Sequence, residues 1–234
     1  MIQVISLDAA HTLMDVNWHP GRFAFESATA FGLTLDSDRA IHAYDTLVRG
    51  RWGQYREINV TRDRTAGDSF WDELTADWLL DMGLDEGLAQ DLSAFARKRM
   101  YTDEAGCFRN YPETIEALES LRAKGYQLVV VSNWDYSLER TLVALGLRSY
   151  FAHVFASLEH GVEKPERALF QIVEHQLQTD PERILHVGDN PLDDYQGARG
   201  AGWRAALLDR SLSETQRPRI PTLLHIAEAL TWTD

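Results

Sequence analysis

The chain is poor in lysine and in cysteine, and it lacks a surplus of positive charge. Lys98, Lys124 and Lys164 are the only lysines among 234 residues, whereas arginine occurs 20 times. The 36 acidic residues outnumber the 23 basic ones and give a formal net charge of −13. The basic surplus typical of nucleic-acid-binding proteins is therefore absent, and we expect no nucleic-acid partner. The single cysteine, Cys107, excludes an intramolecular disulfide and fits a reducing compartment.

Long apolar segments are also missing. No run approaches the roughly 20 consecutive apolar residues that a membrane-spanning helix needs, so we expect no membrane partner. Residues 1–8 contain no basic side chain and reach a charge at Asp8, which does not match a secretory signal peptide. These absences favour a cytoplasmic protein. The composition, 44% hydrophobic and 25% charged, is that of an ordinary globular chain.

Hydrophobic periodicity changes along the chain. Residues 2–7 are apolar and end at Asp8, which predicts a buried strand. From about residue 18 to residue 100 the periodicity is helical. After residue 106 strand-like and helix-like segments alternate, as they do in a parallel sheet with helices on both faces. In the helical part we expect helices over residues 18–31, over residues 37–56, after an N-cap at Asp68, and over residues 84–100.

The alternating segments predict an α/β fold built on a Rossmann-like parallel sheet. The strand at residues 2–7 belongs to this sheet, so the all-helical segment interrupts the α/β domain instead of preceding it. We therefore expect a core domain at residues 1–13 and 106–234 and an inserted all-helical domain at residues 14–105. The later strands of the core are expected at residues 127–131, 153–156, 183–187 and 203–208.

Polar residues follow three of the predicted strands. They are Asp8, the pair Ser132 and Asn133, and Asp189, while Lys164 lies in a loop before a helix. Ligands bind beyond the carboxyl ends of the strands in an open parallel sheet, so we expect these side chains to converge at one edge. Each residue alone is more often a helix cap or a turn residue. Their joint occurrence indicates a site for an anion and a metal ion.

Four short motifs surround these polar residues. They are Asp8-Ala9-Ala10-His11-Thr12-Leu13, Val129-Val130-Val131-Ser132-Asn133, Lys164-Pro165, and Gly188-Asp189-Asn190-Pro191-Leu192-Asp193-Asp194 followed by Gly197-Ala198. The motifs resemble those of the haloacid dehalogenase superfamily. They occur in the family's order, and the resemblance extends over essentially the whole chain. The position of the helical insert is similar to the family's subgroup with a helical C1 cap, which includes dehalogenases, phosphonatases and many small-molecule phosphatases.

The resemblance implies a catalytic role for three residues. Asp8 would be the nucleophile, because a carboxylate can form a covalent aspartyl intermediate that water later cleaves. Ser132 would donate a hydrogen bond to the phosphoryl oxygens. Lys164 would offset the negative charge of the substrate and of Asp8. The partner implied is a small phosphorylated metabolite.

The resemblance also implies a magnesium cofactor, since Mg²⁺ prefers oxygen ligands and keeps several waters. Asp8, the backbone carbonyl of Ala10 and Asp189 would hold the ion. Asp194, or as an alternative Asp193, would support the metal-bound waters.

Four further residues are candidates for substrate contacts. Thr12 and Asn133 lie inside the motifs. Arg49 and Arg51 begin an arginine-rich stretch at residues 49–64 of an otherwise acidic chain. This stretch could reach over the site and select an anionic substrate. The simpler interpretation is a solvated helix face and loop.

Position 10 departs from the family pattern. Phosphatases of this family carry a second Asp two residues after the nucleophile, which protonates the leaving oxygen and then activates water. Here that residue is Ala10, and His11 replaces the usual Gly. Loss of a positioned acid–base group costs about 10²–10⁴-fold in rate, so we expect slow hydrolysis of alkyl phosphates. Neighbouring residues of an extended segment point in opposite directions, so His11 need not reach the same place.

Four functions are compatible with these motifs. The first is a Mg²⁺-dependent phosphohydrolase for substrates with a good leaving group, such as acyl or aryl phosphates. The main alternative is a non-catalytic protein that binds phosphate and metal, and the chain looks most like uncharacterised members of the family that lack the second Asp. A phosphonatase also carries Ala at this position, but it needs a cap lysine for a Schiff base, and Lys98 is the only candidate. A 2-haloacid dehalogenase usually has Tyr there and lacks the acidic ligand that Asp189 represents. The oligomeric state is left open.

Overall fold

The computed structural model describes residues 1–232, which form two compact units. The core unit comprises Met1–Val16 and the chain from Arg109 onward, and the helical unit comprises Asn17–Phe108. The helical unit thus begins and ends three residues later than the insert expected from the sequence. The difference arises at two short strands, β2 (Met14–Val16) and β3 (Phe108–Asn110), which pair with each other where the chain leaves and re-enters the core unit.

A six-stranded parallel sheet runs through the core unit in the order β5-β4-β1-β6-β7-β8. All four residues of β1 are buried, as expected for a strand of a parallel sheet that is covered on both faces. The predicted α/β class with a parallel sheet is therefore confirmed. The strands are β1 (Val4–Leu7), β4 (Gln127–Ser132), β5 (His153–Ala156), β6 (Ile184–Gly188), β7 (Arg204–Leu208) and β8 (Arg219–Ile220).

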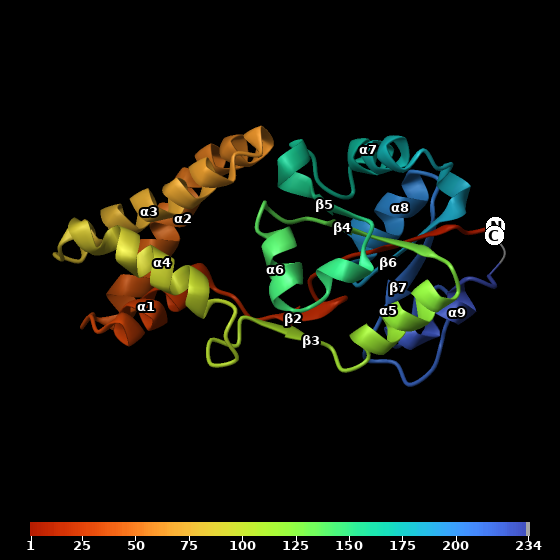
Figure 1. Ribbon diagram of the computed structural model, residues 1–234, viewed down its shortest axis with the longest axis horizontal. Coiled ribbons are helices and arrows are strands. Elements are labelled where there is room, and N and C mark those ends of the chain that lie inside the picture. The colour runs from red at the N-terminus through yellow and green to blue at the C-terminus, as the bar shows by residue number, and fades with distance from the viewer. Residues whose placement is uncertain (233–234) are drawn as a thin grey trace. The chain divides into compact units, whose positions relative to one another are not determined.

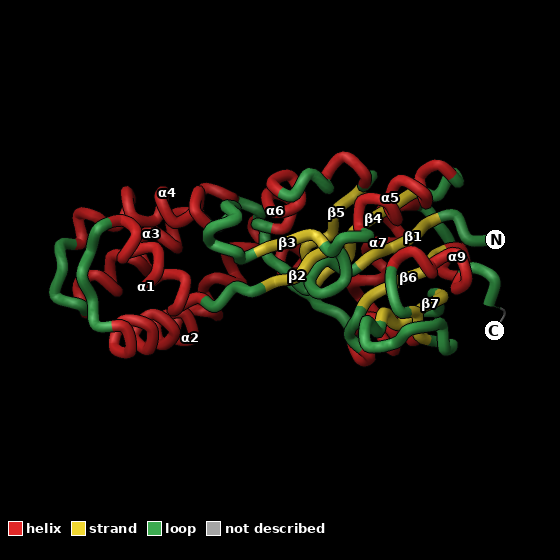
Figure 2. The backbone as a smooth tube through the Cα atoms, turned by 90° about the horizontal axis from the view of Figure 1, so that it is seen from below, coloured by secondary structure: helices red, strands yellow, loops and turns green. Residues whose placement is uncertain are grey.

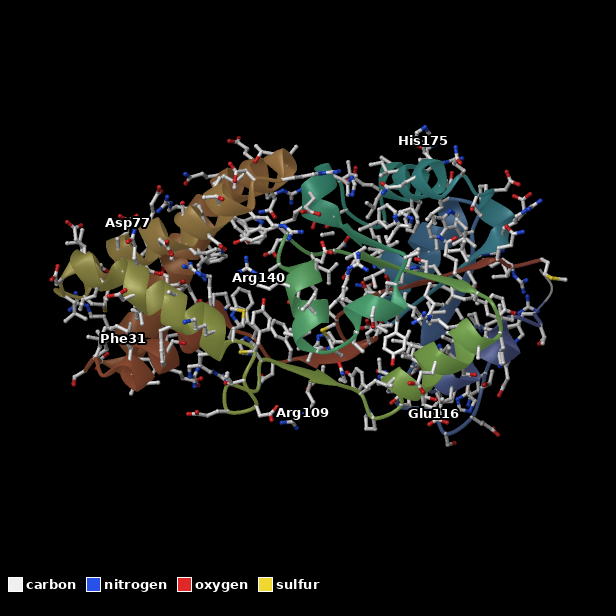
Figure 3. The ribbon with its side chains drawn as sticks, viewed as in Figure 1. Phe31, Asp77, Arg109, Glu116, Arg140 and His175 are labelled. Carbon is white, nitrogen blue, oxygen red and sulfur yellow. The ribbon has the colours of Figure 1, made fainter. Side chains whose placement is uncertain are left out.

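Helices cover both faces of this sheet (Figure 1). On one side lie α7 (Arg167–Leu177) and α8 (Gly197–Gly200), and on the other α5 (Thr114–Ala123) and α9 (Ile226–Ala229). Figure 3 shows His175 on α7 and Glu116 on α5 pointing away from the sheet in opposite directions. A further helix of this unit, α6 (Leu138–Ala144), follows β4.

Aromatic side chains fill the space between the sheet and α7. Phe170 of α7 and Trp203, just before β7, pack edge to face with ring centroids 5.1 Å apart, and both belong to a buried cluster with Val4 and Val131. Burial of a side chain such as Phe170 contributes about 1.5–3 kcal/mol. This packing fixes the strands whose carboxyl ends carry the polar residues.

The helical unit consists of helices joined by loops (Figure 2). Its centre is Trp78, which is fully buried, donates from Nε1 to the carbonyl of Ala40 at 2.9 Å, and packs edge to face with Tyr44. Among residues 1–232, none of the helices is both long and apolar enough to cross a membrane. The helices are α1 (Pro20–Phe31), α2 (Ser37–Thr61), α3 (Arg64–Asp81) and α4 (Ala89–Arg99), with a 3₁₀ turn at Glu86–Leu88 before α4.

One predicted helix start in this unit is wrong. The N-cap of α3 is Asp63, whose carboxylate accepts hydrogen bonds from the backbone N–H groups of Thr65 and Ala66. Asp68, the expected cap, lies inside the helix. Either carboxylate would satisfy the orphan N–H groups of a helix start, and the earlier one does so here.

Cys107 gives a test of the packing where the helical unit ends. The residue is 2% exposed, and burial raises the pKa of its thiol to about 11. Because the thiolate is the reactive form, we expect very slow reaction with a disulfide reagent such as DTNB at mildly alkaline pH. Reaction in urea should be fast and stoichiometric. Fast reaction of the folded protein would contradict the burial described here.

Candidate functional site

The carboxyl ends of three adjacent strands meet at one edge of the sheet. Strand β1 lies between β4 and β6, and Leu7, its last residue, is in register with Val130 and Val187. Asp8 therefore leaves the sheet between its two neighbours. Ser132, the buried last residue of β4, and Asp189, which follows β6, end at the same edge.

Lys164 joins the ends of these strands. Its Nζ donates to Asp8 Oδ1 at 2.7 Å, to Asp194 Oδ1 at 2.5 Å and to the carbonyl of Val131 at 2.9 Å. An ammonium group has three N–H donors, so all of them are used. Burial alone would lower the pKa of Lys164, but the two carboxylates more than offset this and hold its pKa above the usual value. Lys164 is therefore charged at neutral pH.

The acidic residues form a compact group. Single carboxylate oxygens of Asp8, Asp189 and Asp194 all lie within 4.8 Å of one another. Burial raises the pKa of Asp8, and the charge of Lys164 offsets this only in part. Burial and repulsion from Asp8 and Asp194 raise the pKa of Asp189. Three carboxylates face one ammonium, which leaves an excess of two negative charges in a largely buried place.

This group fits a divalent cation. The donors are carboxylate oxygens, which Mg²⁺ prefers, and a charge of +2 would balance the excess. Uncompensated buried charge is costly, so the donor set and the charge balance point to the same kind of ligand.

Asp194 is held in place from several directions. Its Oδ2 accepts from the backbone N–H of Asn190 at 2.9 Å, and its Oδ1 accepts from His186 Nε2 at 3.1 Å as well as from Lys164. Burial would raise its pKa, but the hydrogen bond from His186 and the charge of Lys164 hold that pKa below its usual value. A Cβ atom at Gly188 would lie 2.2 Å from the Asp194 carboxylate. Glycine at position 188 is therefore required by this close approach.

A buried pair, Ser6 and His186, lies beneath Asp194 and is not among the residues expected from the motifs. His186 Nδ1 lies 2.8 Å from Ser6 Oγ, and both residues are fully buried. Burial lowers the pKa of His186, so the ring is neutral at neutral pH. Nε2 must carry the proton, because the Asp194 carboxylate only accepts, and Nδ1 then accepts from the Ser6 hydroxyl. Polar residues at equivalent places in two apolar strands are the signal for this pair, since Ser6 and His186 are in direct register.

Thr12 and Asn133, expected to contact substrate, have partners within the protein. Thr12 Oγ1 donates to Asp189 Oδ1 at 3.2 Å. Asn133 Nδ2 donates to the carbonyl of Lys164 at 2.9 Å, and Asn133 Oδ1 accepts from the N–H of Lys164 at 2.8 Å. Asn133 thus fixes the loop that carries Lys164.

The turn after Asp8 places Ala10 and His11. The N–H groups of Leu13 and Met14 donate to the carbonyl of Ala9, which closes a tight turn. His11 has φ 55°, in the left-handed region that favours glycine. Its side chain is 54% exposed, and Nδ1 lies 3.8 Å from Asp15 Oδ1.

Arg49 and Arg51 lie on α2 of the helical unit. Arg49 donates to Thr46 Oγ1 at 3.2 Å. Arg51 donates to Asp77 and Glu73, each at 2.9 Å, and its guanidinium lies 5.0 Å from the centroid of the Phe70 ring. Arg51 is therefore occupied within its own unit, and a role of either arginine in substrate binding stays a prediction.

Replacement of Lys164 tests its place in the charge balance. Lys164→Met keeps an unbranched side chain of similar length but leaves the buried carboxylates without their cation. We therefore expect the free energy of unfolding in EDTA to fall by about 3–5 kcal/mol. Urea denaturation followed by circular dichroism measures this. The matched control is Lys124→Met at an exposed lysine. A loss no larger than that of the control would show that Lys164 is not needed to balance the cluster.

Comparisons with known proteins identify the same family. A family model described as haloacid dehalogenase-like hydrolase matches residues 2–202. Haloacid dehalogenase-like hydrolase domain-containing protein 3 from Homo sapiens is 28% identical over 244 residues, covering 98% of this chain and 94% of that protein. Phosphoserine phosphatase from Thermus thermophilus is 37% identical over 128 residues, 51% of each chain.

A solved structure agrees in fold along the whole chain. The crystal structure of a 2-haloacid dehalogenase from Pseudomonas syringae pv. Tomato has a TM-score of 0.69 and 25% identity, with 98% of each chain covered. The resemblance expected from the motifs is therefore confirmed. Because the family model spans most of the sequence and the fold agrees along its length, the chain belongs to the haloacid dehalogenase-like hydrolase family.

Proposed function

We propose that this protein is a Mg²⁺-dependent phosphohydrolase that uses Asp8 as its nucleophile. The observation that carries the proposal is the position of Asp8, which lies 2.7 Å from the Lys164 ammonium and within 4.8 Å of two other carboxylates. The relative named phosphoserine phosphatase, which matches about half of the chain, supports the same class of reaction.

Asp8 and Lys164 would perform the first chemical step together. Lys164 holds one carboxylate oxygen of Asp8, which orients the nucleophile and favours its ionised form. Attack by Asp8 forms a bond between a carboxylate oxygen and phosphorus, while the bond from phosphorus to the leaving oxygen breaks and its electron pair leaves with that oxygen. Ser132 would donate to the phosphoryl oxygens. Water then cleaves the acyl phosphate, releasing phosphate and restoring Asp8.

The metal would be held by Asp8, Asp189 and the backbone carbonyl of Ala10. When bound, Mg²⁺ supplies positive charge that offsets the charge of the phosphoryl group and of the carboxylates. Asp194 is already held by Lys164, His186 and Asn190, so we assign it to positioning Lys164 and the water ligands.

Ala10 narrows the class of substrate. An alanine side chain cannot give a proton to the leaving oxygen, and His11, on the exposed side of its turn, lies near Asp15. A leaving group that departs without a proton avoids this deficit. We therefore propose acyl or aryl phosphates as the substrate class.

A 2-haloacid dehalogenase is the second candidate. The likeness to the Pseudomonas syringae enzyme favours it, and halide departs without a proton. The group formed by Asp8, Asp189 and Asp194 favours phosphoryl transfer instead, because it would hold a metal ion that displacement of halide by a carboxylate does not need. Chloride release from 2-chloropropionate in EDTA would favour the 2-haloacid dehalogenase function over the phosphohydrolase function.

Asp8→Asn tests the nucleophile. We expect hydrolysis of p-nitrophenyl phosphate by the unaltered protein to require Mg²⁺ and to stop in EDTA. In Asp8→Asn, kcat should fall by at least about 10³-fold, because the amide is a poor nucleophile. The control is Asp180→Asn, an exposed carboxylate paired with Arg183. Activity that survives in Asp8→Asn or in EDTA would contradict the proposal.

Ala10→Asp tests the missing proton donor. If the rest of the site is competent, a carboxyl group at this position should raise kcat on an alkyl phosphate by about 10²-fold. The gain on an aryl phosphate should be much smaller, because that leaving group needs less help. Steady-state kinetics on ethyl phosphate and p-nitrophenyl phosphate separate the two effects. Equal gains on both substrates, or none on either, would contradict the role given to position 10.

A further inference from the structure

A pocket of about 420 Å³ opens beside the acidic group. Its volume falls within the range of small-molecule sites, and all of its lining residues belong to the core unit. Asp189 lines the pocket and is also part of the acidic group. A ligand in the pocket would therefore lie next to a phosphoryl group bound at Asp8.

Arg210 forms a rigid wall of the pocket. Its Nη2 donates to the carbonyl of Thr12 at 2.8 Å, its Nη1 donates to Glu113, and its guanidinium lies 3.5 Å from the centroid of the Tyr111 ring. Thr12 in turn donates to Asp189. This wall is thus continuous with the acidic group, and the arginine that forms it is already paired.

Arg219 is the more accessible cation of the pocket. Its side chain is 52% exposed, and Nη1 donates to Asp209 Oδ2 at 3.2 Å. The other oxygen of Asp209 accepts from the N–H and the hydroxyl of Ser211. Asp209 is therefore fixed and in turn orients Arg219. A guanidinium has five N–H donors in a planar arrangement that matches a carboxylate, and the bond to Asp209 engages one nitrogen.

The balance of charge favours a singly charged group. Asp189 and Asp209 both line the pocket, so a second phosphate with two charges would be repelled. A carboxylate carries one charge and is planar. Leu207, Leu208 and Pro191 supply apolar walls suited to the carbon atoms between a phosphoryl group and such a carboxylate.

We propose that this pocket is a subsite for the non-transferred part of the substrate, and that Arg219 selects substrates that carry a carboxylate there. The inference rests on the proposed function, since it places the phosphoryl group at Asp8. It extends that function by naming a feature of the substrate and the residue that recognises it.

Pairs of non-hydrolysable phosphonates test the subsite. The shorter pair is phosphonoacetate and ethylphosphonate, and the longer pair is 4-(phosphonomethyl)benzoate and 4-methylbenzylphosphonate. In each pair the first compound carries a carboxylate, and the second carries a methyl group in its place. Isothermal titration calorimetry of the full chain with Mg²⁺ measures their affinities. In at least one pair, we expect the compound with the carboxylate to bind about tenfold more tightly than the compound with the methyl group.

Variants of Arg219 identify the residue responsible. Arg219→Ala should remove the preference for the carboxylate and change the affinity for the methyl compound little. Arg219→Gln, which keeps most of the aliphatic chain but removes the guanidinium, should also remove the preference for the carboxylate. The matched control is Arg183→Ala, since Arg183 is 47% exposed and paired with Asp180, but it precedes β6 at the opposite edge of the sheet. This control should keep the preference.

The outcomes separate this proposal from the proposed function. No preference in either pair, an equal loss for both members in Arg219→Ala, or no binding of any phosphonate would overturn the subsite. If p-nitrophenyl phosphate is hydrolysed as expected and the preference is missing, the subsite fails alone. If the preference depends on Arg219 but the unaltered protein hydrolyses no phosphate ester, the subsite stands and the phosphohydrolase proposal fails.

Discussion

The buried ammonium group of Lys164 joins three segments of the chain that are far apart in sequence. It binds Asp8 after β1, the carbonyl of Val131 in β4 and Asp194 after β6. Each carboxylate would be costly to bury without a partner, and the lysine would be as costly without them. This edge of the sheet is therefore stable only when the segments after β1, in β4 and after β6 are all in place around Lys164. Asn133 supports the arrangement because its side-chain amide accepts from the backbone N–H of Lys164 and donates to the backbone carbonyl of Lys164.

The residues beneath this lysine, Asp194, His186 and Ser6, hold the site in one conformation. Asp194 receives donors from Asn190, His186 and Lys164, and the absence of a side chain at Gly188 lets its carboxylate approach the strand. His186 is fixed by Ser6 on one side and by the rings of Phe170 and Trp203 on the others. Pre-organised groups of this kind need little rearrangement when charge develops during a reaction. Asp8 and Asp189 accept fewer hydrogen bonds, with Lys164 donating to Asp8 and Thr12 to Asp189, and they are the two carboxylates that we propose as metal ligands.

Sequence patterns predict five of the six strands of the sheet, because buried parallel strands are short apolar runs that end in polar residues. Strand β8 has two residues and is too short to give such a pattern. The same patterns could not reveal β2 and β3, since each has three residues and its partner lies about ninety residues away. The start of α3 was misplaced because Asp63 and Asp68 are equally good caps. Ser6 and His186 each stand out as a polar residue in an apolar strand, but their pairing depends on the register between β1 and β6, which neither strand's sequence encodes alone. The surroundings of Arg51 depend in the same way on the packing of α2 against α3.

The central position of β1 has a consequence for the order in which the protein is made. This strand leaves the ribosome ahead of both neighbours, yet each of its four residues is buried in the finished sheet. Its partners begin at residues 127 and 184, after the entire helical unit has been synthesised. An apolar strand without its neighbours is prone to aggregation. The helical unit is synthesised wholly within this interval, and most of its helix–helix contacts join helices that are adjacent in sequence. Strand β1 is thus made before both of its neighbours in the sheet and is among the last elements to become protected.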